Sequence, residues 1–572
     1  MKTPTAPLPL AALLVLSLMA CGAREDDADS GNSAPPPAAD SAQGDGAKVD
    51  KSPEGVFRRA LQAQVGDSGA LHDYYAARDW APYFARTEDT MFRDPGFSAE
   101  ARTLLTELDD SLSHGLNPGE YKADELRKLV DQPPKEMPAL ADGEARLMQA
   151  YLTLARHLAE GREAPQPDVH DWYIPHAEFE AKTALAELET RDVAAALRSF
   201  WPQVLDYQRL REARSRFAKI VAEGGYPSVG GDGLIEPGDE SPEIPDLRQR
   251  LFVGGELAWP EPRGAASENP NVYDEDTVEA LKKFQRRFGI EDDGIIGPGT
   301  RDMLNFPAKH RLAQIDANLE RLRWLPQDLG PDRIMVNVAA FHLRGYKDNQ
   351  VVMRMRVIVG EEQNQTPAFS DTLEYVEVNP YWTVPNSIIV GEIAPKMVED
   401  PGYLARKNMM VQEDWPLDSA QIDPANIDWA AYAHAGADFP YILRQRPGPD
   451  NALGQIKFMF PNDFAIYLHD TPTDHLFDEV DRTFSHGCIR LEYPVEFAGF
   501  VFDDTPDWDA QRVKQTIGSA QHTQIGLSDA DKIPVYIYYN TAWADADGTI
   551  YFRPDRYGRD DVLIQRELRD PL

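Results

Sequence analysis

The sequence predicts a multidomain α+β protein in which helical segments come first and a mainly β region follows. From about residue 55 to 235, apolar residues recur with helical spacing, and a second, compact helical unit covers about 240 to 306. Beyond residue 330 the texture changes to alternating or continuous apolar runs typical of strands. With 572 residues and 42% hydrophobic composition, the chain can bury several cores.

Residues 1–20 have the pattern of a signal peptide: a start with Lys2, then an apolar run too short to span a membrane as a mature helix. The end of this run, Leu18-Met19-Ala20-Cys21, resembles a bacterial lipobox, which implies that Cys21 is lipidated. Gly22 follows, where Asp would suggest retention in the inner membrane, so the resemblance favours an outer-membrane anchor facing the periplasm. The alternative is an ordinary secretory signal cleaved near a cysteine.

Residues 21–54 are rich in Ala, Pro, Asp, Ser and Gly, and this composition predicts a disordered tether. The chain has only two cysteines. If Cys21 carries lipid, Cys488 is the one thiol left in an exported, oxidising compartment.

Residues 55–235 are expected to form a helical domain. One apolar stripe begins after Ser98, includes Leu112 and ends before Gly115; another runs through Leu147–Leu158 and ends at Gly161. Stripes of this kind form cores, so no chemistry is assigned to them.

Residues 240–306 are expected to form a small three-helix unit, after a cluster of Gly and Pro that marks a boundary. Asp274 is suited to cap a helix whose buried face ends at Phe288, and Gly297-Pro298 opens the next helix. The unit resembles a peptidoglycan-binding domain. Glycan binding and a spacer role both stay open for it.

Residues 332–518 are expected to form a mainly β domain. Its predicted strands lie in 333–343, 351–360, 457–461 and 464–470. The Pro-rich stretch 387–450 does not fit a sheet and predicts a helical or loop insertion that serves as a lid. Residues 519–572 are expected to form a β-rich extension that packs on the helical domain 55–235 or on the β domain 332–518.

The charge of the chain excludes one class of partner. The formal net charge is −37 and the pI is near 4.7. Nucleic-acid binding draws most of its affinity from clustered Lys and Arg, so no nucleic-acid partner is expected.

The stretch R-T-F-S-H-G-C-I-R-L, which contains Cys488, has the residues of an acyl-transfer site. A thiol needs a base within reach, and His486 and His469 are the local candidates. Gly487 permits a tight turn that brings N–H groups towards an oxyanion. A buried inert thiol and a zinc site that includes His475 are the alternatives.

His469, then fifteen residues, then Ser485-His486-Gly487-Cys488-Ile489-Arg490 resembles the signature of the L,D-transpeptidases. Further segments resemble the large multidomain branch of that family, which has a scaffold domain and a peptidoglycan-binding-like domain; they are 114–118, 365–369, 379–385, 453–462 and 551–555.

The resemblance implies a role for each residue of this motif. Cys488 would be the nucleophile and His469 the general base, its other ring nitrogen held by a backbone carbonyl such as that of Asp470. The N–H groups of Gly487 and Cys488 would form the oxyanion hole, with His486 bordering it.

The residues implied on the substrate side are Arg490, Ser485, Trp382 and Tyr467; Arg490 either fixes the loop or meets a substrate carboxylate. No cofactor or metal is implied. The substrates implied are peptidoglycan tetrapeptide stems as donor and acceptor, with release of D-alanine and cross-linking of third-position diamino acids. Hydrolysis, D-amino-acid exchange, protein anchoring and a non-enzymatic wall-binding spacer remain alternatives.

Overall fold

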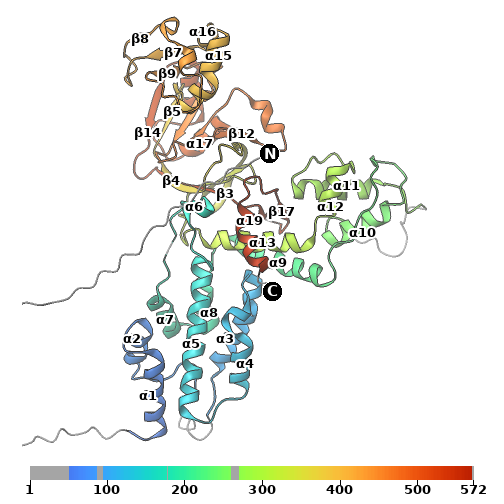
Figure 1. Ribbon diagram of the computed structural model, residues 1–572, viewed down its shortest axis with the longest axis vertical. Coiled ribbons are helices and arrows are strands. Elements are labelled where there is room, and N and C mark those ends of the chain that lie inside the picture. Colours follow the sequence, from blue (N-terminus) through green and yellow to red (C-terminus); the bar gives the residue numbers. More distant parts are fainter. Residues whose placement is uncertain (1–49, 87–94, 177, 259–268, 546, 570–572) are drawn as a thin grey trace, which may run out of the picture. The chain divides into compact units, whose positions relative to one another are not determined.

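The computed structural model describes residues 50–86, 95–176, 178–258, 269–545 and 547–569 (Figure 1). The expected signal peptide, Cys21 and most of the expected tether lie outside these residues. Among the described helices, none combines the length and the hydropathy of a transmembrane span. The predicted class is confirmed, because a helical N-terminal part and a small helical unit precede a mainly β part.

The N-terminal part is helical. Its α-helices are α1 Pro53–Val65, α2 Ala70–Ala77, α3 Ala99–Asp110, α4 Ala123–Asp131, α5 Met137–Glu160, α6 Pro167–His170, α7 Ala181–Thr190, α8 Val193–Arg198 and α9 Leu205–Ala222, with 3-10 turns at Ser111–His114 and Pro118–Tyr121.

The predicted helix ends in this part are confirmed: Ser98 is the N-cap of α3, and Gly115 and Gly161 follow helices with φ of 71° and 87°. The prediction that the apolar stripe is buried was wrong at Leu112, which is 41% exposed. Leu112 lies in the 3-10 turn after α3, where the 3.6-residue period no longer applies.

The small unit contains three helices, α10 Ile244–Gly254, α11 Glu275–Phe288 and α12 Pro298–Leu304. The predicted cap is confirmed, because the Asp274 side chain accepts a hydrogen bond from the N–H of Thr277 at 3.0 Å. Phe288 is buried with the rest of the predicted apolar face of α11.

The mainly β part is built on one 11-stranded sheet with the order β14-β5-β10-β11-β13-β3-β2-β1-β15-β4, and β12 pairs with β3. The strands are β1 Arg333–Asn337, β2 His342–Lys347, β3 Gln350–Gly360, β4 Phe369–Leu373, β5 Tyr375–Val378, β10 Ile456–Met459, β11 Leu468–His469, β12 Thr483–Ser485, β13 Ile489–Leu491, β14 Thr523–Gly526 and β15 Ile533–Tyr538. Helices α17 Pro494–Val501 and α18 Ala510–Gly518 and the 3-10 turn Asp474–Asp478 complete this part.

The sheet curls upon itself. A single residue, Glu374, joins β4 at one end of the strand order to β5 near the other. Because the two steps from Leu373 to Tyr375 cover at most about 7 Å, less than two strand spacings, the two ends of the sheet must meet. The apolar side chains of both halves consequently enclose one core, which contains Val336, Val376, Phe458 and Ile537.

The predicted strand 333–343 is two strands, β1 and β2, separated by a turn in which Phe341 has φ of 57°. The insertion also differs from the prediction, because it contains strands of its own. With β6 Trp382–Thr383 it forms a four-stranded sheet in the order β6-β9-β7-β8. The elements of this lid are β7 Met409–Gln412, β8 Gln421–Ile422, β9 Ile442–Gln445, α14 Asn386–Ile388, the π-helix Ile389–Ile393, α15 Ala394–Glu399, α16 Tyr403–Arg406 and the 3-10 turns Pro424–Asn426 and Trp429–Ala431.

The expected domain limit at residue 518 cuts through the sheet. Strand β14 pairs with β5, and β15 pairs in parallel with β1, about 200 residues earlier in the chain. Only the last segment packs as an extension: the hairpin β16 Ala542–Ala544 and β17 Ile550–Phe552, then α19 Arg559–Arg569.

Helix α13, Ala308–Arg323, is buried although it is rich in charged residues. Two of its charged side chains pair with other helices: Arg214 donates to Asp316 at 2.5 and 3.1 Å, and Arg321 pairs with Asp560 of α19 at 2.5 Å. Thr541 donates to the second oxygen of Asp560 at 2.6 Å. These charged groups can be buried because each of them is paired with a group of opposite charge.

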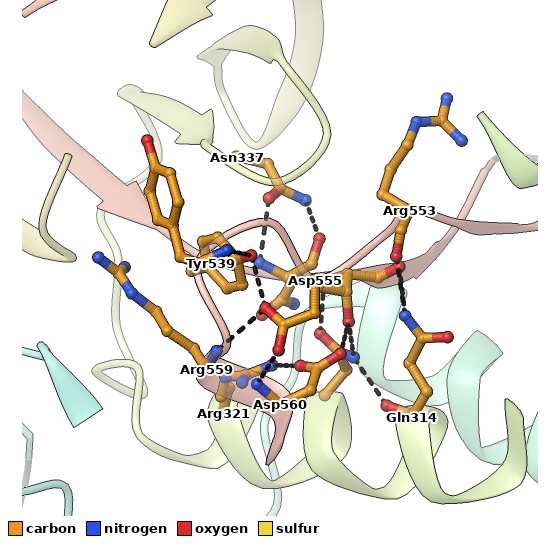
Figure 2. A network of polar contacts seen from close by, with 12 residues as sticks. Gln314, Arg321, Asn337, Tyr539, Arg553, Asp555, Arg559 and Asp560 are labelled. Atoms are coloured by element: carbon orange, nitrogen blue, oxygen red, sulfur yellow. Dashed lines mark hydrogen bonds and ion pairs between the residues drawn. The ribbon is translucent and has the colours of Figure 1, made fainter. Parts of the chain in front are cut away.

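The Asp555 side chain caps the N-terminal end of α19 and links this helix to the sheet (Figure 2). Its carboxylate accepts the N–H groups of Arg559 and Asp560 at 3.0 and 2.6 Å and the hydroxyl of Tyr539 at 2.7 Å. Asn337 at the end of β1 exchanges two hydrogen bonds of 3.0 Å with the backbone of Asn540. The last segment is therefore held to both α13 and the sheet.

Replacing Asp560 by Ala is expected to destabilise the protein strongly, because the buried charge of Arg321 loses its partner, a loss of about 3–5 kcal/mol. The measurement is the midpoint of thermal unfolding. Asp561→Ala is the matched control, since Asp561 is the exposed neighbour on the same helix. Equal midpoints for the two variants would contradict the importance of the pair.

Candidate active site

A row of polar side chains crosses the sheet at one register. Lys457 of β10 is paired with Glu377 of β5 on one side and with His469 of β11 on the other. His469 is in turn paired with Arg490 of β13. Because directly paired residues on neighbouring strands project to the same face, these four side chains share one face of the sheet.

The residues next to this row point the other way. Val376, Phe458, Leu468 and Ile489 are fully buried in the core that the curled sheet encloses. The side-chain period of a strand is two, so burying these residues places Glu377, Lys457, His469 and Arg490 on the opposite face.

The loop from Ser485 to Cys488 has a constrained backbone. Gly487 has φ of 109°, which an L residue adopts only with strain. The Ser485 hydroxyl accepts the N–H of Gly487 at 3.1 Å and donates to the carbonyl of Cys488 at 2.5 Å.

These two hydrogen bonds change two expectations. The N–H of Gly487 is used within the loop, so it does not face an oxyanion as expected. Ser485 was expected to bind substrate; it lines the cavity, but it is 3% exposed and its hydroxyl forms hydrogen bonds within the loop. Of the two donors expected for an oxyanion hole, the N–H of Cys488 remains.

Thr366 supports the backbone of this loop through hydrogen bonds. Its hydroxyl donates to the carbonyl of Gly487 at 2.8 Å and accepts the N–H of Gly360 at 3.0 Å. The hydroxyl of Tyr557 donates to the carbonyl of Gly360, and Arg559 donates to the carbonyl of Thr366 at 3.1 Å. The C-terminal segment therefore reaches the loop through Thr366.

The thiol of Cys488 is half-buried. The thiol donates to the carbonyl of Ala465 at 3.8 Å and interacts with Tyr467. Among the described residues, its hydrogen-bond partners do not include His469. Burial raises the pKa of the thiol, against the opposing effects of Tyr467, Lys457 and Arg490. At neutral pH the thiol is therefore protonated.

His469 is 4% exposed, and its Nδ1 lies 2.5 Å from the carbonyl oxygen of Asp470, the partner that was expected. A carbonyl only accepts, so Nδ1 carries the proton and Nε2 keeps a lone pair. Burial, followed by the charges of Arg490 and Lys457, lowers the pKa of His469 to about 3. The ring is therefore a neutral base throughout the neutral range.

The sequence analysis missed Lys457. Its ammonium lies 4.4 Å from the ring centre of Tyr467 and 3.7 Å from a carboxylate oxygen of Glu377. The Tyr467 ring lies 5.6 Å from that of His469. The alternation in K-F-M-F was a usable signal, because it places Lys457 opposite the buried phenylalanines, but the pairing with His469 needs the register.

Arg490 fixes the neighbouring segments, which is one of its two expected roles. It donates to the hydroxyl of Thr473 at 3.3 Å and to the carbonyl of Phe484 at 3.2 Å. Both acceptors are uncharged, so its charge remains available to an anionic group in the pocket.

Three residues of the row, Lys457, His469 and Arg490, line a cavity of about 860 Å³ together with the loop. The lid forms the facing wall with Trp382, Trp415, Phe439 and Tyr441, and Tyr467 lies on the sheet side. Trp382 and Tyr467 are therefore placed as expected. Trp415 was not foreseen; it lines the cavity and is 65% exposed.

His486 points towards the lid. It is exposed, and its Nε2 lies 2.9 Å from Oε1 of Glu392. His475 is also exposed and does not line the cavity, which agrees with its predicted place in a surface loop. Among the described residues, no group of three or more His, Cys, Asp or Glu side chains is arranged to hold a metal ion.

Three family models match the chain. Residues 331–511 match the model described as the L,D-transpeptidase catalytic domain, and residues 69–213 match the model described as a scaffold domain. Residues 263–304 match a "Putative peptidoglycan binding domain". The chain carries a catalytic domain of the L,D-transpeptidase family. The lid, the loop at Cys488 and all the strands of the curled sheet except β14 and β15 lie within the matched residues.

A curated relative, "Putative L,D-transpeptidase" from Haemophilus influenzae, is 36% identical over 251 residues, which are 44% of this chain and 49% of the relative. The match thus spans about half of the relative's length.

Two solved structures are also similar. One is the crystal structure of an L,D-transpeptidase from Xylanimonas cellulosilytica, with 15% identity, a TM-score of 0.15 and coverage of 54% of this chain and 99% of that chain. The other is the Ldtfm–avibactam carbamoyl enzyme, with 11% identity, a TM-score of 0.18 and coverage of 57% and 98%. At these TM-scores the family assignment rests on the sequence matches.

In this L,D-transpeptidase domain, Lys457→Met is expected to raise the pKa of Cys488 further, because a nearby positive charge is lost. Because a smaller fraction of the thiol is then ionised, alkylation at fixed pH should become about three- to tenfold slower. The measurement is the rate of iodoacetamide modification against pH. Lys514→Met, at an exposed site on α18, is the control, and the same profile in both variants would contradict the role of Lys457.

Thr366→Val is expected to loosen the loop, because the buried carbonyl of Gly487 and N–H of Gly360 lose their partner, a cost of about 1–3 kcal/mol. Hydrogen exchange should become faster in residues 482–491. Thr372→Val on β4, a half-buried site away from the loop, is the control. Unchanged exchange in 482–491 would show that the loop holds its shape without Thr366.

Proposed function

We propose that this protein is an exported L,D-transpeptidase that acts on peptidoglycan tetrapeptide stems through a thioester on Cys488. The observation that carries the proposal is the pair of groups in one cavity: a thiol, and an imidazole kept neutral by burial between Lys457 and Arg490. A neutral imidazole whose Nδ1 is held by the carbonyl of Asp470 is the base that acyl transfer requires.

The resting pair is a thiol and a neutral base, so the proton must move as the substrate binds. In the proposed first step, a rotation of the Cys488 side chain brings the thiol from Ala465 towards Nε2 of His469. His469 takes the proton while sulfur attacks the carbonyl that precedes the terminal D-alanine. The oxyanion is met by the N–H of Cys488, and His469 returns the proton to the leaving amine.

The second step gives the cross-link. The side-chain amine of a second stem attacks the thioester, an amide forms, and Cys488 is released as the thiol. Water competes for the thioester, and a covered site favours the amine. The aromatic wall of the lid supports cross-linking over hydrolysis, while hydrolysis, D-amino-acid exchange and protein anchoring remain other fates of the same intermediate.

Two features support stems as the substrate class. Arg490 and Lys457 give the sheet side of the cavity positive charge, although the chain as a whole is strongly acidic, and stem peptides carry carboxylates. The match to a peptidoglycan binding domain supports the same polymer as the partner.

The proposed location is the periplasm, with lipid on Cys21 anchoring the protein to the outer membrane. Support comes from the signal-like run and the lipobox-like end alone. Mass spectrometry of the mature N-terminus tests it: a diacylglycerol on Cys21 agrees with the proposal, and a free amine on another residue contradicts it.

Purified protein incubated with disaccharide-tetrapeptides is expected to release D-alanine and form a cross-linked dimer. Cys488→Ala should abolish both products, and His469→Gln should lower the rate of D-alanine release by a factor of about 10² to 10⁴. Mass spectrometry of the products is the measurement.

His475→Gln is the matched control for His469→Gln, because His475 is exposed and lies outside the cavity. Dimer formation that survives Cys488→Ala would refute the assignment. A wild-type protein that gives no D-alanine and no acyl adduct with a carbapenem would favour a wall-binding spacer.

A further inference from the structure

We propose that Glu392 of the lid recognises the ammonium group of the acyl acceptor and thereby favours cross-linking over hydrolysis. The inference rests on the proposed function and adds an acceptor site to it.

The first observation is the distribution of charge around the cavity. Among its described lining residues, Glu392 is the only carboxylate. The full positive charges, Lys457 and Arg490, lie on the sheet side, whereas Glu392 comes from the lid. The cavity therefore has positive charge on its sheet side and negative charge at Glu392 on its lid side. A bound molecule meets charges of opposite sign at the two sides.

The second observation is how the lid presents this side chain. Glu392 lies in the π-helix Ile389–Ile393, whose widened turn is closed by the N–H of Ala394 and the carbonyl of Ile389. Ile389 and Ile393 are buried in the core of the lid. This burial fixes the turn, and π-turns occur frequently at functional sites.

The contacts of Glu392 place it close to the reacting centre. Its Oε1 lies 2.9 Å from Nε2 of His486, two residues before Cys488. Its Oε2 lies 3.2 Å from the ammonium of Lys396, one helical turn further along the lid. The carboxylate is 40% exposed and the Lys396 side chain 46% exposed, so a second ammonium can replace Lys396 at low cost.

The two half-reactions need opposite charges. The donor stem brings carboxylates, which suit Lys457 and Arg490. The acceptor brings a side-chain ammonium, which suits a carboxylate. Water has no charge for Glu392 to recognise, so this residue discriminates between the two acceptors of the thioester.

The proton balance is complete without another reactant. The bound ammonium gives one proton to His486, beside Glu392, and becomes a nucleophilic amine. Its nitrogen attacks the thioester carbonyl, and the second proton passes to His469. The carbon–sulfur bond breaks, and the thiolate of Cys488 takes that proton from His469. The products are the amide and the thiol, with one proton left on His486 for release to solvent.

The test is the fate of the acyl-enzyme in Glu392→Gln. With disaccharide-tetrapeptides, the ratio of dimer to hydrolysed tripeptide is expected to fall about two- to fivefold, the size of a lost ion pair at a half-exposed site. Glu399→Gln is the matched control, because Glu399 is an exposed glutamate of the same lid that does not line the cavity.

Hydroxylamine, which is mostly uncharged at neutral pH, separates recognition of charge from general damage. A loss restricted to the stem acceptor supports the proposal, and an equal loss with hydroxylamine overturns it. Lys396→Met is a second variant: removing the competing ammonium should raise the ratio of dimer to tripeptide, and an unchanged or lower ratio counts against the proposal.

The two levels of inference fail differently. If wild-type protein releases no D-alanine, the proposed function fails. If wild-type protein forms dimers and Glu392→Gln forms them in the same ratio to tripeptide, the proposed function stands and the assignment of Glu392 fails.

Discussion

The pairing register of β5, β10, β11 and β13 is the constraint on which the site depends. The enclosed core accepts only the apolar set of each strand, and this fixes which residues face the cavity. A slip by one residue would turn Lys457 and His469 towards the apolar core and turn Phe458 and Leu468 towards the cavity. The same pairing places His469 between two cations, and together with burial they keep its imidazole neutral.

The catalytic loop depends on a second layer of contacts that comes from distant parts of the chain. Thr366 holds the backbone of Gly487, and the C-terminal segment holds Thr366 through Tyr557 and Arg559. That segment is anchored by Asp560 to the buried helix α13. The loop around the thiol is thus positioned by hydrogen bonds and ion pairs that link it to distant segments, and its backbone conformation requires glycine at position 487.

The lid contributes aromatic rings and one carboxylate to the cavity, and the sheet side contributes the cations. The lid has its own apolar core, so it presents Trp382, Trp415 and Glu392 from a stable frame. The cavity is then bounded by cations on one side and by aromatic rings and one carboxylate on the other. This polarity gives the two proposed substrates, an anionic donor and a cationic acceptor, different places to bind.

The sequence by itself determined the helical periods and their caps at Ser98 and Asp274, and it singled out Cys488, His469 and Gly487, because these signals are local in the chain. Tertiary structure alone decided the roles of Ser485, Lys457 and Glu392, the burial of α13 and the membership of β14 and β15 in the sheet. Each of these depends on pairing between residues far apart in sequence, such as β15 with β1 and Arg321 with Asp560. A periodic pattern shows which face of an element is buried but not which partner covers it.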